Sequence, residues 1–152
     1  MKLSDWQIKN YSPLGMSVDE ILNQNDVSND RKFESLFYRI DLKPSMNHKP
    51  GYESFTDTER KIREIWIVFG EVGNGGFDQY FCNSSGDCAE IVLAGLKEIG
   101  ADDAAVIMLR AMSIFPDGDP FGDEGQLLEE LAYDSYHLLE ECDKEFIGLQ
   151  DK

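Results

Sequence analysis

Repeated helix-start patterns, with very little strand-like alternation between them, restrict the fold of this chain more than any other sequence feature. Three segments pair a capping residue with a glutamate three positions later, which is the capping-box pattern of a helix N-terminus. These segments are Ser17–Glu20, Thr56–Glu59 and Asp87–Glu90. Apolar residues then recur with the spacing of one helical face, as in Ile62, Ile65, Trp66 and Phe69. The sequence therefore predicts an all-α protein.

The helices are expected to surround one apolar stretch. Residues 104–115 are apolar on nearly every side, interrupted by Arg110 and Ser113, which is typical of a central, buried helix. The 152 residues suit a single compact domain, which we expect to contain about six helices around helix 102–115. The predicted divisions are an N-terminal segment with a short helix, a helical domain and a C-terminal tail, at residues 1–28, 29–146 and 147–152.

Individual helix ends are also predicted. The helix that starts after Thr56 should end at Gly70 or Gly73, because glycine often follows the last helical turn. Asp87 should cap the next long helix. The most clearly amphipathic helix is expected at residues 123–143, with an apolar arc formed by Leu127, Leu128, Leu131, Ala132, Ser135, Leu138, Leu139 and Cys142.

The charge of the chain excludes several classes of partner. Its formal net charge is −16, and residues 71–152 hold 19 acidic residues against four basic ones. Such a chain repels phosphate backbones and anionic membranes, so we expect no direct binding to nucleic acid or membrane. The sequence lacks a spanning apolar run and a signal-peptide pattern, which predicts a cytoplasmic protein. Three cysteines, Cys82, Cys88 and Cys142, indicate reduced thiols in or near the core.

Most of the excess acid lies late in the chain, on the polar side of the helix expected at 123–143 and in the loop before it. This acidic face is a candidate partner-binding surface, although acids also serve solubility alone. Its residues are Asp117, Asp119, Asp123, Glu129, Glu130, Asp134, Glu140 and Glu141.

No pattern in the sequence indicates a metal, a cofactor or an enzyme. Residues 117–122 resemble the start of a calcium loop, but Phe121 and Leu128 occupy positions that require oxygen ligands. Nucleophile, phosphate-loop and metal-ligand motifs are also missing from the sequence. We therefore expect a non-enzymatic protein that needs no cofactor and no metal.

A glycine-rich stretch, residues 74–87, separates two of the predicted helices. Asn74, Gly75 and Gly76 tolerate positive φ angles and should form a tight corner between helices. The aromatic residues that follow should fill the core, and two polar residues should cap helix ends. These residues are Phe77, Tyr80 and Phe81 for the core, and Asn83 and Asp87 for the caps.

Residues 71–87, with the later Leu96–Ala101 and Ala111–Pro116 segments, resemble a bacterial all-helical family that includes a DNA-mimic protein and many uncharacterised members. The resemblance implies surface carboxylates that imitate DNA phosphates and occupy the DNA-binding face of a transcription regulator. A homodimer is among the arrangements that it implies. Carboxylates three or four positions apart on a helix lie about 5–6 Å apart, which allows a phosphate-like row on the acidic face.

The leading hypothesis is therefore an acidic decoy that binds a basic DNA-binding protein. An immunity or antitoxin-like inhibitor of a nuclease has the same electrostatics and stays open. A small-ligand or enzymatic site at the 74–87 corner is a third hypothesis, and acidity that serves solubility alone is a fourth.

Overall fold

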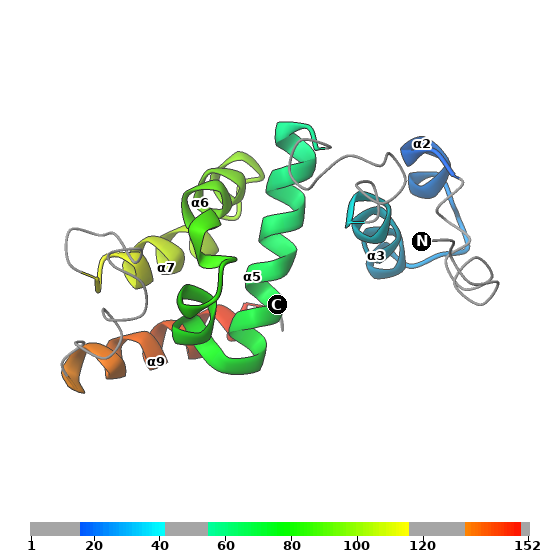
Figure 1. The fold of residues 1–152 in the computed structure, drawn as a ribbon. Helices are drawn as coiled ribbons and strands as arrows, with labels where there is room; N and C mark the ends of the chain where they lie inside the picture. The colour runs from blue at the N-terminus through cyan, green and yellow to red at the C-terminus, as the bar shows by residue number, and fades with distance from the viewer. Residues whose placement is uncertain (1–15, 42–54, 116–132, 150–152) are drawn as a thin grey trace. The chain divides into compact units, whose positions relative to one another are not determined.

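The computed structural model describes residues 16–41, 55–115 and 133–149 (Figure 1). Within these ranges the chain forms six α-helices, one 3-10 helix and no strand, which confirms the all-α prediction. The elements are α2 (Val18–Leu22), α3 (Asn29–Asp41), α5 (Asp57–Cys82), η3 (Gly86–Cys88), α6 (Ala89–Glu98), α7 (Asp102–Met112) and α9 (Tyr133–Gly148). The chain divides into two compact units, Met1–Arg63 and Glu64–Lys152, and each is described by itself.

The first unit contains α2, α3 and the first turns of α5. Ser17 caps α2 as predicted, because its hydroxyl accepts from the Glu20 N–H at 3.2 Å while the Glu20 carboxylate accepts from the Ser17 N–H at 2.6 Å. The same reciprocal bonds join Thr56 and Glu59 at the start of α5. Helix α2 packs against α3.

The second unit holds the main hydrophobic core, built from α5, α6, α7 and α9. Helix α7 lies between α6 and α9 and packs against both. Aromatic rings join the distant parts of the chain: Phe146 of α9 stacks on Phe69 of α5 at 4.5 Å, and its ring lies edge-on to Phe77 at 5.2 Å. Such ring pairs add stability beyond the apolar area that they bury.

Helix α7 is less buried than the sequence predicts. Six of its residues are buried, but Val106 is 63% exposed and Leu109 is 48% exposed. The helix also ends at Met112, and a turn carries the chain to the buried Phe115. Helices α6 and α9 cover only part of the surface of α7. A helix with apolar residues on every side can therefore leave some of them exposed to solvent.

The predicted end of the first segment of α5 and the predicted start of α6 are also wrong. The first segment of α5 continues through Gly70 and Gly73 as far as the kink at Gly76, because buried residues such as Val68 and Val72 hold it against the core. A glycine inside a helix costs only about 1 kcal/mol, which this packing offsets. At α6, Asp87 does not act as the cap: it lies inside η3, which runs directly into α6, and the cap residue Cys88 makes no side-chain capping bond.

Candidate functional site

The predicted corner between helices lies at Gly76, inside α5. Gly76 has φ 83° and ψ 178°, a conformation that divides α5 into two helical segments. A Cβ atom at this position would lie 2.5 Å from Oδ2 of Asp143 on α9. Glycine is therefore required here for two reasons, the backbone angle and the close approach of a carboxylate.

Helix α9 supplies the groups that hold this corner. Oδ1 of Asp143 accepts a hydrogen bond from the Phe77 N–H at 2.7 Å, at the start of the segment that follows the kink. The carboxylate therefore satisfies a helix N-terminus from another helix, as a capping side chain does. On the same side of α9, the Tyr136 hydroxyl donates to Oδ2 of Asp78 at 3.1 Å.

Burial and neighbouring carboxylates shift the pKa values of two side chains at the corner, Asp143 and Tyr136. Burial raises the pKa of Asp143, and the charges of Asp78 and Glu140 raise it further, while the hydrogen bond from Phe77 acts in the opposite direction. The bond to Asp78 raises the pKa of the Tyr136 hydroxyl. Asp143 and Tyr136, whose pKa values are raised, both join α9 to α5, and this arrangement supports a structural role for the corner.

The residues predicted for this corner divide into two groups. Phe77, Tyr80 and Phe81 are buried in the core, as predicted. Asn74, Gly75, Asn83 and Asp87 are exposed. Asn83 directly follows the last residue of α5, where its backbone N–H donates to the Gln79 carbonyl at 3.1 Å and its side-chain amide donates to Oε2 of Glu71 at 3.1 Å.

The acidic face predicted for partner binding is only partly described. Asp117, Asp119, Asp123, Glu129 and Glu130 lie outside the described residues, as does the side chain of Asp134. Glu140 and Glu141 lie on α9 and are exposed.

Sequence reasoning missed Glu145, which lies one turn beyond Glu141 and is also exposed. Its carboxylate pairs with Arg110 of α7 at 2.8 Å. The side chain of His137 is exposed, and its Nδ1 lies 3.3 Å from Oε2 of Glu140.

The inner side of α9 also differs from its prediction. Leu139, Cys142 and Phe146 are buried, whereas Leu138 is 51% exposed and does not belong to the apolar face. Phe146 was missed because the helix was expected to end at residue 143. The spacing of Leu139, Cys142 and Phe146, at i, i+3 and i+7, is the signal that could have found it.

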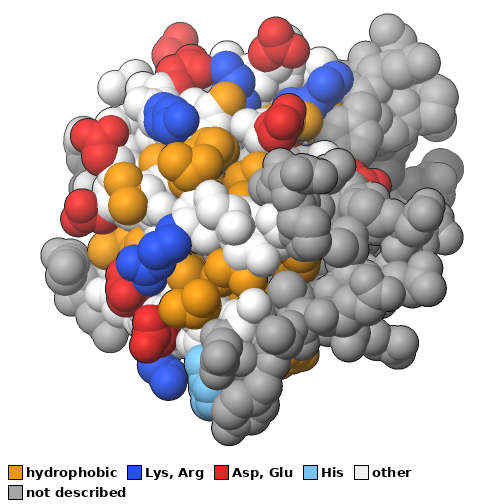
Figure 2. Space-filling model, turned by 90° about the vertical axis from the view of Figure 1, so that its left-hand side faces the viewer, with side chains coloured by type: hydrophobic (Ala, Val, Ile, Leu, Met, Phe, Trp, Pro, Cys, Tyr) orange, Lys and Arg blue, Asp and Glu red, His pale blue; other side chains and the backbone are white. Residues whose placement is uncertain are grey.

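One face of the molecule shows how the charges are distributed. Figure 2 shows acidic side chains in separate groups, with hydrophobic and basic side chains between them. Exposed apolar residues of the second unit include Ile99, Val106, Leu109 and Leu138. On this face, the described carboxylates therefore lie within a mixed surface.

The cysteines are free thiols in three different places. Cys88 and Cys142 are buried, as predicted, but Cys82 is exposed at the end of α5, contrary to the prediction. Burial raises the pKa of Cys142, and Arg110, whose Nε lies 3.4 Å from its sulfur, lowers it. Among the described helices, none combines the length and the apolar character that crossing a membrane requires.

A comparison with known protein families gives a match over the part of the chain that contains the Gly76 corner and α9. A sequence model of the DMP19-like proteins matches residues 53–152. The chain belongs to this family. The DMP19-like region includes the Gly76 corner, α6, α7 and α9, while α2 and α3 precede it. Searches of curated proteins and of solved structures found no significant match.

Proposed function

We propose that this DMP19-like protein is an acidic decoy that binds the basic DNA-binding surface of a transcription regulator or another DNA-binding protein. The observation that carries the proposal is the charge of the second unit. Its described residues, 64–115 and 133–149, include 13 acidic residues and only three basic ones. Of the 12 whose side chains the structure describes, only Glu64 is buried.

Helix α9 supports the proposal through its geometry. Glu141 and Glu145 lie one turn apart on its exposed side, and Glu140 is adjacent to them. Side chains at this spacing are about 5–6 Å apart, which is within the range of a row of phosphates. Among the described residues of the second unit, Lys144 and the paired Arg110 bring positive charge to this part of the surface. A positive groove-reading surface would therefore be attracted at long range, with fast and salt-sensitive association.

The exposed apolar residues add a feature that duplex DNA lacks. Val106 and Leu109 of α7 and Leu138 of α9 offer apolar contact area near the carboxylates of the second unit. Apolar burial is not screened by salt, whereas the attraction between exposed charges is. We therefore expect a partner to bind this protein with a weaker salt dependence than it binds DNA.

Affinity capture from a lysate of the native host tests the proposal. The wild-type chain is compared with a variant in which Glu129, Glu130, Asp134, Glu140 and Glu141 become Gln or Asn. A matched control neutralises five other exposed carboxylates: Asp19, Asp26, Glu34, Asp87 and Glu90. Bound proteins are eluted with salt or with duplex DNA and identified by mass spectrometry.

The expected prey is one basic DNA-binding protein that wild type and the control retain, that the variant loses, and that duplex DNA displaces. Recovery of a nuclease in its place would favour the inhibitor hypothesis. Retention of the same prey by the variant, or loss of the prey in the control as well, would overturn the role given to this acidic face.

A further inference from the structure

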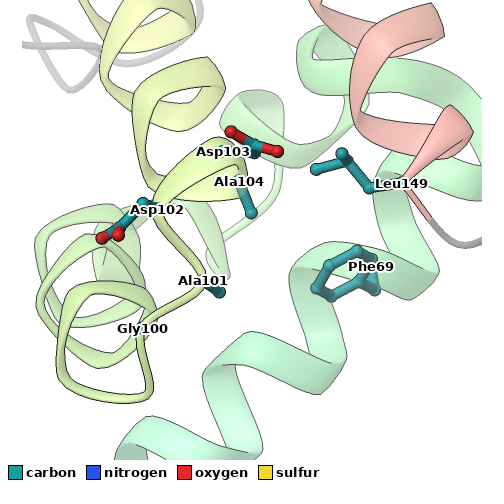
Figure 3. Close-up of a pocket in the computed structure, with 7 residues that line it drawn as sticks. All are labelled: Phe69, Gly100, Ala101, Asp102, Asp103, Ala104 and Leu149. Carbon is teal, nitrogen blue, oxygen red and sulfur yellow. The ribbon is translucent and has the colours of Figure 1, made fainter. Parts of the chain in front are cut away.

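A hollow of about 490 Å³ opens at the start of α7, within the second unit. Its lining comes from residues 100–104 and from two side chains far away in the sequence, Phe69 of α5 and Leu149 after α9 (Figure 3). Such a volume is within the usual range for small-ligand pockets, and one bulky side chain would fill only part of it.

The hollow has an apolar floor and a carboxylate at its rim. Phe69 is fixed by its stack on Phe146, and Leu149 and Ala101 are partly buried against the core. Figure 3 shows the side chains of Asp103 and Leu149 extending toward each other above the ring of Phe69, while Asp102 points away.

The charge at this rim is uncompensated within the part of the chain that the structure describes. Neither Asp102 nor Asp103 has a hydrogen-bond or ion-pair partner among the described residues. The N-terminus of α7, which has no side-chain cap, contributes about half a positive charge. Two carboxylates exceed this, so the rim attracts cations and repels anions.

We infer that the hollow binds a cationic side chain with an aliphatic stem, a lysine or arginine presented by a partner protein. The stem of such a side chain covers apolar surface while its charged end stays at the rim. Phe69 and Leu149 would contact the stem, and Asp103 would pair with the charged end. This site lies at the start of α7, apart from the acidic face, and does not depend on the decoy proposal.

A titration followed by NMR tests this inference on the full chain. The probes are N-acetyl-lysine methylamide and its neutral counterpart, N-acetyl-norleucine methylamide. We expect the lysine compound to shift the Ala104 amide and Leu149 methyl signals in a saturable way, and to bind more tightly than the norleucine compound. The Asp103→Asn variant should weaken binding of the lysine compound about fivefold. Asp87→Asn, which removes the same charge from an exposed site in η3, should leave binding within about twofold.

Three results would overturn the inference: no saturable shift, equal binding of the two probes, or equal weakening by Asp103→Asn and Asp87→Asn. Asp103→Asn also removes a favourable charge from the N-terminus of α7, so helicity is measured in parallel. Leu149→Ala is a second variant, which keeps every charge and shortens one wall of the hollow. It should weaken the binding of both probes. Failure here would leave the lysate capture unaffected, because the two experiments change different residues.

Discussion

The two sides of α9 have opposite characters. The inner side packs in the hydrophobic core and stabilises the fold, whereas the outer side is exposed and available to a partner. The inner side carries Leu139, Cys142 and Phe146, all buried, and Asp143, which caps the kinked segment of α5. The outer side carries Glu140, Glu141 and Glu145, all exposed. The Gly76 corner of α5 lies opposite the inner side, whereas the outer side combines these carboxylates with exposed apolar residues such as Leu138.

The largest expected effect lies on the inner side. Phe146→Ala removes a fully buried ring that contacts Phe69 and Phe77, so the free energy of unfolding should fall by about 3–5 kcal/mol. Ile147→Ala, at the next and more exposed position, should change it by less than about 1 kcal/mol. Chemical denaturation of both variants measures the difference. Equal losses would show that α9 does not have the two-sided character described here.

Two glycines of α5 should respond in opposite directions. Gly76→Ala forces a side chain into a left-handed φ and against Asp143, which should cost about 1–3 kcal/mol. Gly73→Ala places a methyl group in open space on a regular helical turn, and should stabilise the protein by about 0.5–1 kcal/mol. Thermal unfolding of the two variants decides this, and a stabilising Gly76→Ala would contradict the corner geometry.

Two substitutions of Asp143 separate its hydrogen bond from its charge. Asp143→Ala leaves the Phe77 N–H without its acceptor and should lower stability by about 1 kcal/mol. Asp143→Asn keeps an acceptor oxygen and removes a partly buried charge, so it should be less harmful at pH 7.

The two Asp143 variants also give a pH test. The folded protein raises the pKa of Asp143 above its ordinary value of 3.8, so the folded state binds the proton more tightly than the unfolded state. Wild-type stability relative to Asp143→Asn should therefore fall as pH rises from 3.8 through the raised pKa, and level off above it. Unfolding curves between pH 3.5 and 7 measure this difference. A difference that rises with pH would reverse the sign and contradict the role of burial.

The smallest expected effect is at the Arg110–Glu145 pair. Both side chains are about half exposed, and exposed pairs contribute about 0–1 kcal/mol. Glu145→Gln should therefore change the unfolding midpoint very little, and the change should diminish in high salt. A large loss of stability would show that Glu145 contributes to folding and would contradict the separation between the two sides of α9.

Local signals predicted some of these elements and failed for others. The reciprocal bonds of Ser17–Glu20 and Thr56–Glu59 involve residues three positions apart, so the sequence itself contains both partners. Gly70 and Gly73 look like helix ends, but the packing of distant residues continues the helix through them. The capping of Phe77 by Asp143 joins residues 66 positions apart, and no local pattern shows it. The acidic face was predicted from the polar side of the helix expected at 123–143 and from the loop before it, and five of its eight residues lie outside the described ranges.

We propose that the outer side of α9 binds a partner protein and that it is dispensable for folding. The most direct measurement is capture of the partner from the host lysate by wild type and by a Glu140→Gln, Glu141→Gln, Glu145→Gln variant, together with the unfolding midpoint of each. We predict a nearly unchanged midpoint and a large loss of captured DNA-binding protein. Full capture by the variant, or a loss of capture that occurs only because the variant unfolds, would contradict the claim.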